Sequence, residues 1–282
     1  MNTQPLAGKV ALITGANTGI GRVTAVQLAL QGAHVFLACR SEAKTRPVLD
    51  EINARSNGSA KAEFLALDLG YFDSVRHCAA SFLARGLPLH LLINNAGLAG
   101  QKGITESGFE LTFGVCHVGH FLLTNLLLDC LKASAPARIV VVASKAHRHV
   151  KGIDFNALRQ PTSSVGGLHE YSVAKLANIL FAAELARRLQ GTGVTSYALH
   201  PGVVATDVWR AVPKFITMLL KRFMLSSEDG AATTLYCATS PACVSESGLY
   251  YDSQKPQQPS PAARNVELAQ QLWHASEGWI RA

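Results

Sequence analysis

The sequence predicts an α/β fold in which a doubly wound parallel sheet of about seven strands carries helices on both faces. Strand-like and helix-like segments alternate along the chain, as they do when crossover helices join parallel strands. The strand-like segments are almost continuously apolar, which is expected when both faces of a sheet are covered. With 282 residues, 48% of them hydrophobic, and no clear interdomain linker or internal repeat, the chain can form one large domain.

The predicted strands are short apolar runs, which in chain order are 9–14, 34–39, 64–67, 89–94, 138–143, 194–199 and 249–251. The predicted helices between them are 20–31, 41–54, 73–85, 109–133 and a helix that contains Tyr171. The first helix ends at Gly32, a residue type that often ends helices because it adopts a left-handed backbone conformation. Two polar segments rich in helix breakers, 152–167 and 254–261, are expected to be surface loops of the same domain.

Composition and charge limit the classes of partner. The formal net charge is +7, but the basic residues are scattered, so we expect no nucleic-acid partner. The six cysteines form no Cys-x-x-Cys pair and no cluster with metal-ligand spacing, which predicts free thiols and no metal site. No apolar run reaches the roughly 18 residues of a membrane span, and the first residues lack a secretion signal. We therefore expect a cytoplasmic protein, with peripheral contact to an acidic membrane and assembly into a homo-oligomer left open.

A glycine-rich turn follows the first predicted strand and opens the first predicted helix. Its sequence is Thr14-Gly15-Ala16-Asn17-Thr18-Gly19-Ile20-Gly21. Glycines let the backbone turn tightly and approach a pyrophosphate that rests on the helix N-terminus. A glycine-rich turn in isolation is often only a turn, but the strand-turn-helix context favours a dinucleotide site. The predicted cofactor contacts in this turn are Gly15, Asn17, Thr18, Gly19, Ile20 and Gly21.

The ends of the second and third strands indicate which dinucleotide binds. An acidic residue after the second strand would hold the adenosine ribose hydroxyls and select NAD, but Cys39-Arg40-Ser41 contains none. Arg40 is placed to pair with a 2′-phosphate, which predicts NADP(H), and the alternative is a solvated surface arginine. Asp68-Leu69 follows the third strand, where Asp68 either accepts a hydrogen bond from the adenine amino group or caps the next helix.

Two further turns complete the predicted cofactor site. The segment 94–97 follows the fourth strand, and its small residues let a cofactor ribose lie against the backbone, unless it is a plain turn. The segment 200–206 follows the sixth strand and offers a rigid Pro-Gly turn and a hydroxyl suited to a nicotinamide carboxamide. The predicted contacts in these turns are Asn95, Ala96, Gly97, Pro201, Gly202, Val204 and Thr206.

Candidate catalytic groups lie on a predicted helix and at the end of the fifth strand. Tyr171 and Lys175 are four positions apart, so on a helix their side chains can point into one site. A free phenol is a weak acid with a pKa of roughly 10, and a cation beside it favours the phenolate. The alternative is a half-buried tyrosine near a surface lysine. Ser144 directly follows the fifth strand, where its hydroxyl can reach a substrate carbonyl beside Tyr171.

Taken together, these motifs resemble the short-chain dehydrogenase/reductase family, and within it the retinol dehydrogenase-like branch. The resemblance extends from Lys9 to about Trp273 and is carried by Leu37-Ala38-Cys39-Arg40, Gly119-His120-Phe121-Leu122-Leu123-Thr124, Ala146-His147 and Lys175-Leu176-Ala177-Asn178. It implies a single Rossmann-type domain over residues 1–282, with Ser144, Tyr171 and Lys175 at the family's catalytic positions. Tyr171 and Lys175 would also contact the cofactor. The implied reaction is an NADP(H)-dependent interconversion of an alcohol and a carbonyl compound.

The substrate side is less specific. In this family the region after the Pro-Gly turn, here about 203–226, covers the substrate. Apolar residues between Val212 and Phe223 recur at helical spacing and can share one face, which favours a lipophilic aldehyde or ketone such as a retinoid. Ordinary core packing is the alternative. Lys214, Lys221 and Arg222 lie off that face, so contact with a membrane surface is a further alternative.

Cys116 departs from the family pattern. In segments like 116–121 the family usually places an asparagine first, which kinks the helix and helps to hold a water in a proton relay to the active-site lysine. A thiol is a weaker hydrogen-bonding group than an amide. Three hypotheses follow: an enzyme with slowed turnover, an enzyme in which another group or a water replaces the asparagine, or a low-turnover NADP-binding scaffold or redox-sensing protein. The presence of Ser144, Tyr171 and Lys175 favours the enzyme.

Overall fold

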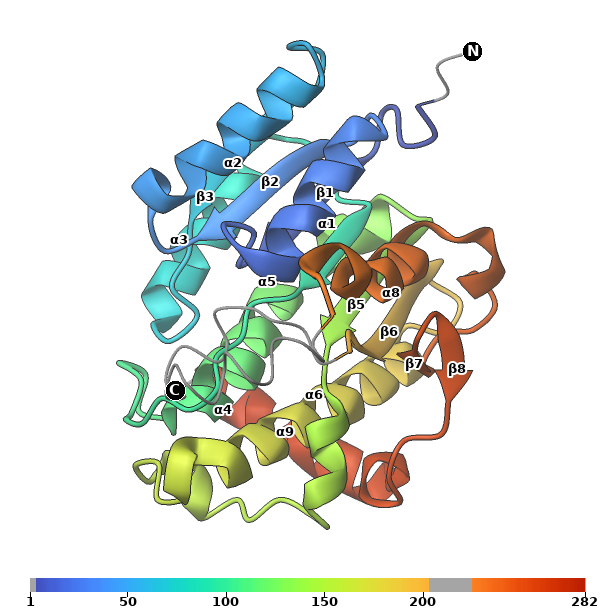
Figure 1. Cartoon of the computed structure of the whole chain (residues 1–282). Helices are drawn as coiled ribbons and strands as arrows, with labels where there is room; N and C mark the ends of the chain where they lie inside the picture. The colour runs from blue at the N-terminus through green and yellow to red at the C-terminus, as the bar shows by residue number, and fades with distance from the viewer. Residues whose placement is uncertain (1–3, 203–224, 282) are drawn as a thin grey trace.

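One eight-stranded sheet forms the centre of the computed structural model, which describes residues 4–202 and 225–281 (Figure 1). The strands are β1 (Val10–Thr14), β2 (His34–Cys39), β3 (Ala62–Ala66), β4 (Leu91–Asn94), β5 (Ala137–Val142), β6 (Val194–His200), β7 (Tyr250–Asp252) and β8 (Lys255–Gln257). Their order is β3-β2-β1-β4-β5-β6-β7-β8, and all pairs are parallel except β7 with β8. The order reverses between β1 and β4, so the fold is doubly wound, as predicted.

All seven predicted strands are present, and β8 is the strand that the prediction missed. It lies inside the segment 254–261, for which the sequence predicts a loop, and that prediction is wrong for Lys255–Gln257. The three residues are exposed and show no apolar pattern, and they pair with β7 only because a tight turn reverses the chain. Ser253 and Gln254 form that turn with positive φ values of 51° and 61°.

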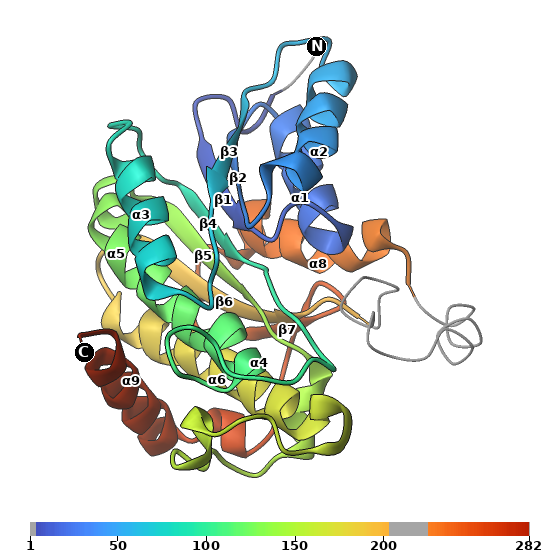
Figure 2. The same cartoon turned by 90° about the vertical axis from the view of Figure 1, so that its left-hand side faces the viewer.

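Helices cover both faces of the sheet (Figure 2). The first layer contains α1 (Gly19–Leu30), α2 (Glu42–Arg55) and α8 (Ser227–Thr239). The second layer contains α3 (Phe72–Leu83), α5 (Gly119–Ala133), α6 (Leu168–Arg188) and α9 (Val266–Arg281). Alternate residues of each strand belong to the two apolar cores between sheet and helices: in β5, Ile139 and Val141 belong to one core, and Val140 and Val142 to the other. This arrangement explains why the strands are apolar throughout.

Short helices connect these elements. They are α4 (Leu111–Phe113), the π-helix η1 (Gly114–Val118) and the 3₁₀ helices η2 (Lys145–His149), η3 (Ala157–Arg159), η4 (Val165–Gly167), η7 (Pro241–Cys243) and η8 (Ala262–Arg264). The predicted helix 109–133 is therefore one rod built from α4, η1 and α5, with a π-helical turn near its start. Periodicity alone does not distinguish this turn from regular α-helix, because η1 adds only one residue to the turn.

The helical rod from Leu111 to Ala133 corrects the prediction that no apolar run reaches the length of a membrane span. It has 23 residues, and an 18-residue window within it has a mean hydropathy of 1.5, so by length and composition it could cross a membrane. However, its most apolar window is 72% buried inside the protein, where it packs in the second helical layer. Burial in this core accounts for its apolar composition.

Helices α8 and α9 were not predicted from the sequence. The C-terminal helix α9 packs on α5 and α6 through aromatic rings: the Trp273 ring lies 5.0 Å from that of Phe121 and 6.0 Å from that of Phe181. The hydroxyl oxygen Oγ of Ser276, on α9, lies 3.1 Å from Nε2 of the buried His117. Helix α9 is therefore part of the apolar core between the sheet and the second helical layer.

Candidate functional site

A cavity of about 430 Å³ opens at the carboxyl ends of strands β1 to β6. Its lining includes residues that follow successive strands: Gly15 after β1, Arg40 after β2, Asn95 after β4, Ser144 after β5 and Pro201 after β6. In open α/β sheets, ligands bind at this edge, next to the point where the strand order reverses. The fold thus brings segments that are far apart in the sequence to one site.

Every predicted site residue that the structure describes lines this cavity. These residues are Gly15, Asn17, Thr18, Gly19, Ile20, Gly21, Arg40, Asp68, Leu69, Asn95, Ala96, Gly97, Ser144, Tyr171, Lys175, Pro201 and Gly202. Two predicted residues, Val204 and Thr206, and the apolar segment from Val212 to Phe223 lie outside the described residues.

The glycine-rich turn is packed so closely that two of its glycines have no room for a side chain. A Cβ atom on Gly21 would lie 2.4 Å from the Gly15 oxygen and 2.5 Å from Nδ2 of Asn95. Gly15 has a φ of 66°, and a Cβ atom there would lie 2.9 Å from the Cα of Ala96. The turn therefore places bare backbone and the N-terminus of α1 at the cavity, which together suit a phosphate group.

A buried network joins this turn to β4 and to the π-helix. Oγ1 of Thr14 accepts hydrogen bonds from the backbone N–H groups of Asn95 and Ala96, both at 2.9 Å, and lies 2.8 Å from Nε2 of His120. The other ring nitrogen, Nδ1, lies 3.0 Å from the Cys116 carbonyl oxygen. A carbonyl only accepts, so Nδ1 carries the proton and the Thr14 hydroxyl donates to Nε2. Burial lowers the pKa of His120 to about 4, so the ring is neutral.

Asn95 also fastens the end of β4 to the glycine-rich turn. Its Nδ2 donates to the Thr14 carbonyl at 2.8 Å. Thr14 and His120 were not among the predicted site residues. The available signal was that each is a polar residue in an otherwise apolar segment.

Tyr171 and Lys175 lie on the same side of α6, as their spacing predicts. Nζ of Lys175 is 5.6 Å from the centre of the Tyr171 ring. Lys175 is only 4% exposed, and its Nζ donates to the Val142 carbonyl at 2.8 Å. Asn178 donates to the same carbonyl through Nδ2 at 3.2 Å. The lysine is therefore held against Val142, the last residue of β5, two residues before Ser144.

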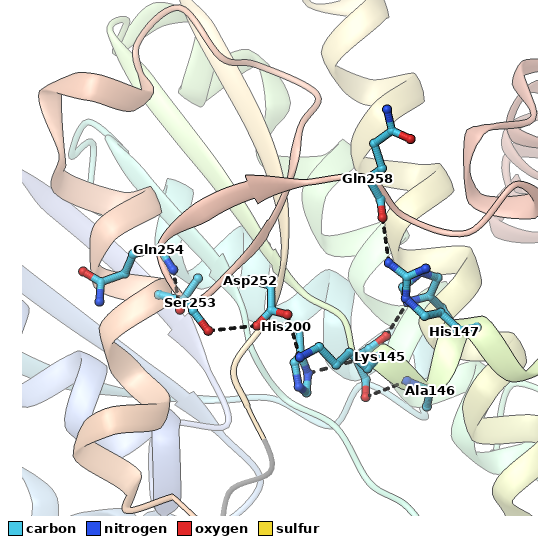
Figure 3. A network of polar contacts seen from close by, with 11 residues as sticks. Lys145, Ala146, His147, His200, Asp252, Ser253, Gln254 and Gln258 are labelled. Atoms are coloured by element: carbon cyan, nitrogen blue, oxygen red, sulfur yellow. Dashed lines mark hydrogen bonds and ion pairs between the residues drawn. The ribbon is translucent and has the colours of Figure 1, made fainter.

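The segment after β5 is held from the C-terminal part of the chain. The Ser144 carbonyl accepts a hydrogen bond from Nδ1 of His147 at 2.6 Å, and the Ser144 Oγ accepts one from the Ala146 N–H at 3.2 Å (Figure 3). Nε2 of His147 accepts a hydrogen bond from the Ser260 N–H at 3.1 Å. Burial lowers the pKa of His147, which keeps the ring in the neutral form that both contacts require.

Arg40 and Asp68 line the cavity and follow β2 and β3 in the chain. The Arg40 side chain is exposed and makes no ion pair or hydrogen bond with any residue the structure describes, so its guanidinium is free to meet a ligand. Oδ1 of Asp68 accepts a hydrogen bond from the Gly70 N–H at 2.9 Å. The next helix, α3, begins at Phe72 after Tyr71, with no side-chain cap. The helix-cap alternative for Asp68 is therefore wrong.

Cys116 lies inside the π-helix η1 and is completely buried. Its Sγ is 3.8 Å from the Leu98 carbonyl oxygen. A Cβ atom on Gly97 would lie 3.5 Å from both the Cys116 Sγ and the Lys175 Nζ, so the thiol and the ammonium both lie beside the Gly97 backbone. Burial raises the pKa of the Cys116 thiol. A buried, protonated thiol is a poor nucleophile and a poor redox sensor.

Comparison with known proteins identifies the family. The short chain dehydrogenase model matches residues 9–216. Retinol dehydrogenase 12 of Homo sapiens is 45% identical over 274 residues, covering 96% of this chain and 86% of that protein. A crystal structure of a Mycobacterium paratuberculosis protein has a TM-score of 0.77 at 31% identity, covering 98% of this chain and 95% of its own. A Beutenbergia cavernae structure with NADP bound at low occupancy has a TM-score of 0.69 at 25% identity, covering 89% and 97%. The chain therefore belongs to the short-chain dehydrogenase family of oxidoreductases, in its retinol dehydrogenase-like branch.

Proposed function

We propose that the protein is an NADP(H)-dependent enzyme that interconverts a lipophilic carbonyl compound and its alcohol, with a retinoid as the favoured substrate. The observation that carries the proposal is one cavity that combines a phosphate-binding turn with Ser144, Tyr171 and Lys175. The retinoid assignment is supported by the relative named retinol dehydrogenase. The cofactor assignment is supported by Arg40 and by the related structure that holds NADP.

The residues of the cavity fit a dinucleotide. The glycines at 15, 19 and 21 leave the backbone of the turn bare for a pyrophosphate, and glycine is required at 15 and 21 because a Cβ atom there would clash with Ala96, Asn95 or the turn itself. We assign Arg40 to the 2′-phosphate, Asp68 to the adenine amino group and the turn 95–97 to a ribose. Lys175 and Tyr171 would contact the nicotinamide ribose, and Pro201, Gly202, Val204 and Thr206 the carboxamide. When bound, the nicotinamide supplies the hydride.

The chain's own residues supply the proton and the polarity that the reduction needs. Tyr171 donates its phenolic proton to the carbonyl oxygen of the substrate. Lys175, held 5.6 Å from the ring centre, stabilises the phenolate that remains. Ser144 donates a hydrogen bond to the same oxygen and orients the carbonyl for attack. In the oxidative direction Tyr171 takes the proton from the alcohol, and the other two residues keep their roles.

The substrate side of the proposal concerns the segment near 203–226. Its two described ends meet at the cavity: a Cβ atom on Gly202 would lie 2.4 Å from Cδ1 of Leu225. The described residues that flank 203–224 therefore lie beside the cavity that Gly202 lines, which supports assigning this segment to the substrate side. We extend the proposal to a cytoplasmic protein whose basic and apolar residues in this segment contact a membrane surface that carries the lipophilic substrate.

The assignment of Arg40 to the 2′-phosphate predicts a preference for NADPH over NADH. NADPH should bind at least about tenfold more tightly than NADH, because a hydrogen bond to a charged group contributes about 1.5 to 3 kcal/mol and tenfold equals about 1.4 kcal/mol. Arg40→Ala should remove most of this difference. Fluorescence titration of both cofactors measures it, with Arg46→Ala as the control, since Arg46 pairs with Glu42 on the nearby α2. Equal affinities of the wild type for NADPH and NADH would contradict the assignment.

A screen of NADPH consumption over aldehydes and ketones, including retinal, tests the function. We expect saturable consumption with a lipophilic carbonyl and formation of the alcohol. NADPH binding without turnover on any carbonyl would favour the second candidate, a low-turnover NADP-binding scaffold. The observation behind that candidate is Cys116 at the usual asparagine position. Its redox-sensing form is less supported, because the thiol is buried and protonated.

A further inference from the structure

His200, the last residue of β6, lies in the cavity wall next to Pro201. The side chain is well enclosed, since the residue is only 4% exposed. The Lys145 backbone N–H donates a hydrogen bond to its Nδ1 at 3.3 Å (Figure 3). A backbone N–H only donates, so Nδ1 is the acceptor, and the neutral ring carries its proton on Nε2.

The surroundings keep this ring neutral. Burial lowers the pKa of His200 to about 4; Asp252 opposes the shift, and the nearby Lys145, His147 and Lys175 add to it. The Asp252 carboxylate is engaged by Nζ of Lys145, with 2.6 Å between Nζ and Oδ2 (Figure 3). The proton therefore stays on Nε2 over the physiological pH range.

His200 differs from the two other buried histidines at this edge of the sheet. In His120 and His147, both ring nitrogens have hydrogen-bond partners. In His200, Nδ1 is bonded but Nε2 has no acceptor anywhere in residues 4–202 and 225–281. Buried donors are normally paired in folded proteins. An enclosed N–H in a cavity wall is therefore suited to an acceptor on a bound molecule.

We propose that His200 donates a hydrogen bond from Nε2–H to a neutral carbonyl oxygen of a molecule bound in the cavity. The inference rests on the proposed function, which offers two such oxygens: that of the substrate and that of the nicotinamide carboxamide. His200 lies between the Ser144 segment, through Lys145, and the Pro201-Gly202 turn, so it adjoins both predicted subsites. It is a binding residue of the site that acts beside Ser144 and Tyr171 without donating the proton that is transferred.

Two substitutions separate this role from a structural one. In His200→Gln, the side-chain amide reaches the position of Nε2 and keeps a donor toward the cavity, but the contact to Lys145 is lost. In His200→Asn, the shorter side chain places Oδ1 near the position of Nδ1, so it keeps the contact to Lys145 and loses the donor. For both variants and the wild type, we would measure the NADPH dissociation constant, kcat/KM for retinal at saturating NADPH, and Tm. His77→Asn on the exposed face of α3 is the control.

We expect His200→Asn to lose about fivefold either in NADPH affinity or in kcat/KM for retinal, which is the effect of losing one neutral hydrogen bond. His200→Gln should stay closer to the wild type in the same quantity. A loss in NADPH affinity assigns the acceptor to the carboxamide, and a loss in kcat/KM alone assigns it to the substrate. If His200→Gln has no higher NADPH affinity and no higher kcat/KM than His200→Asn, the inference is overturned, because His200 then only holds the Lys145 segment. If the wild type turns over no carbonyl, the proposed function fails, and the same ranking of NADPH affinities still decides the role of His200.

Discussion

Tyr171→Phe is expected to lower kcat by about 10²- to 10⁴-fold, the range for the loss of a general acid, while NADPH affinity stays within about twofold. The phenylalanine ring keeps the packing of Tyr171 on α6 and its position 5.6 Å from the Lys175 ammonium. Only the phenolic proton is lost. Steady-state kinetics with retinal, a fluorescence titration with NADPH and a melting curve together measure the effect.

Tyr71→Phe is the matched control for this substitution. Tyr71 is 46% exposed, and its hydroxyl donates to Asp73 at the surface, away from the cavity. Its loss should leave kcat unchanged. A Tyr171→Phe protein that keeps more than about a tenth of the wild-type kcat would show that the proton comes from another group.

Cys116→Asn is expected to raise kcat by about 10- to 100-fold, equal to about 1.4 to 2.8 kcal/mol of activation free energy, with no change in NADPH affinity. The π-helix η1 already provides the irregular helix that the family asparagine is associated with, so the backbone geometry is in place. What is missing is a strongly polar side chain beside Gly97 and Lys175. An asparagine amide at this position can donate a hydrogen bond to the Leu98 carbonyl oxygen. The Cys116 Sγ lies 3.8 Å from that oxygen.

The Cys116→Asn experiment needs a control for the tight packing around residue 116. Cys116 is completely buried, and asparagine is larger and needs partners for its polar atoms. Cys116→Ser adds a polar group without adding volume, and should lie between the wild type and Cys116→Asn in kcat. A stable Cys116→Asn protein, judged by Tm, with unchanged or lower kcat would mean that Cys116 does not impair the proton relay. An inactive wild type that gains activity on this substitution would favour the scaffold hypothesis.

The fold was predictable because its main signals are local. Each of the first six strands is an apolar run followed by a polar or glycine-containing turn, and each run became a strand within two residues of its predicted start. The parts that were missed depend on tertiary contacts. β8 has three exposed residues and forms only against β7, and α9 becomes recognisable as a core helix only where Trp273 meets Phe121 and Phe181.

The same distinction applies to the site. The spacing of Tyr171 and Lys175 and the glycine-rich turn are short motifs, so the sequence shows them directly. The residues that hold the site in place act across the chain: Thr14 and His120 are 106 positions apart, and His147 and Ser260 are 113 apart. No local pattern connects such pairs. The irregular turn at Cys116 was equally invisible, since a π-helical turn has no distinct apolar period over five residues.

The central claim is that hydride passes from a nicotinamide to a lipophilic carbonyl in the cavity that Ser144, Tyr171 and Lys175 line. Incubating the wild type with retinal and NADPH that carries deuterium in both positions at C4, followed by mass spectrometry of the product, tests it most directly. The account predicts retinol with one deuterium on the carbinol carbon, formed by the wild type and nearly absent with Tyr171→Phe. Retinol without deuterium, or oxidation of NADPH without formation of retinol, would contradict it.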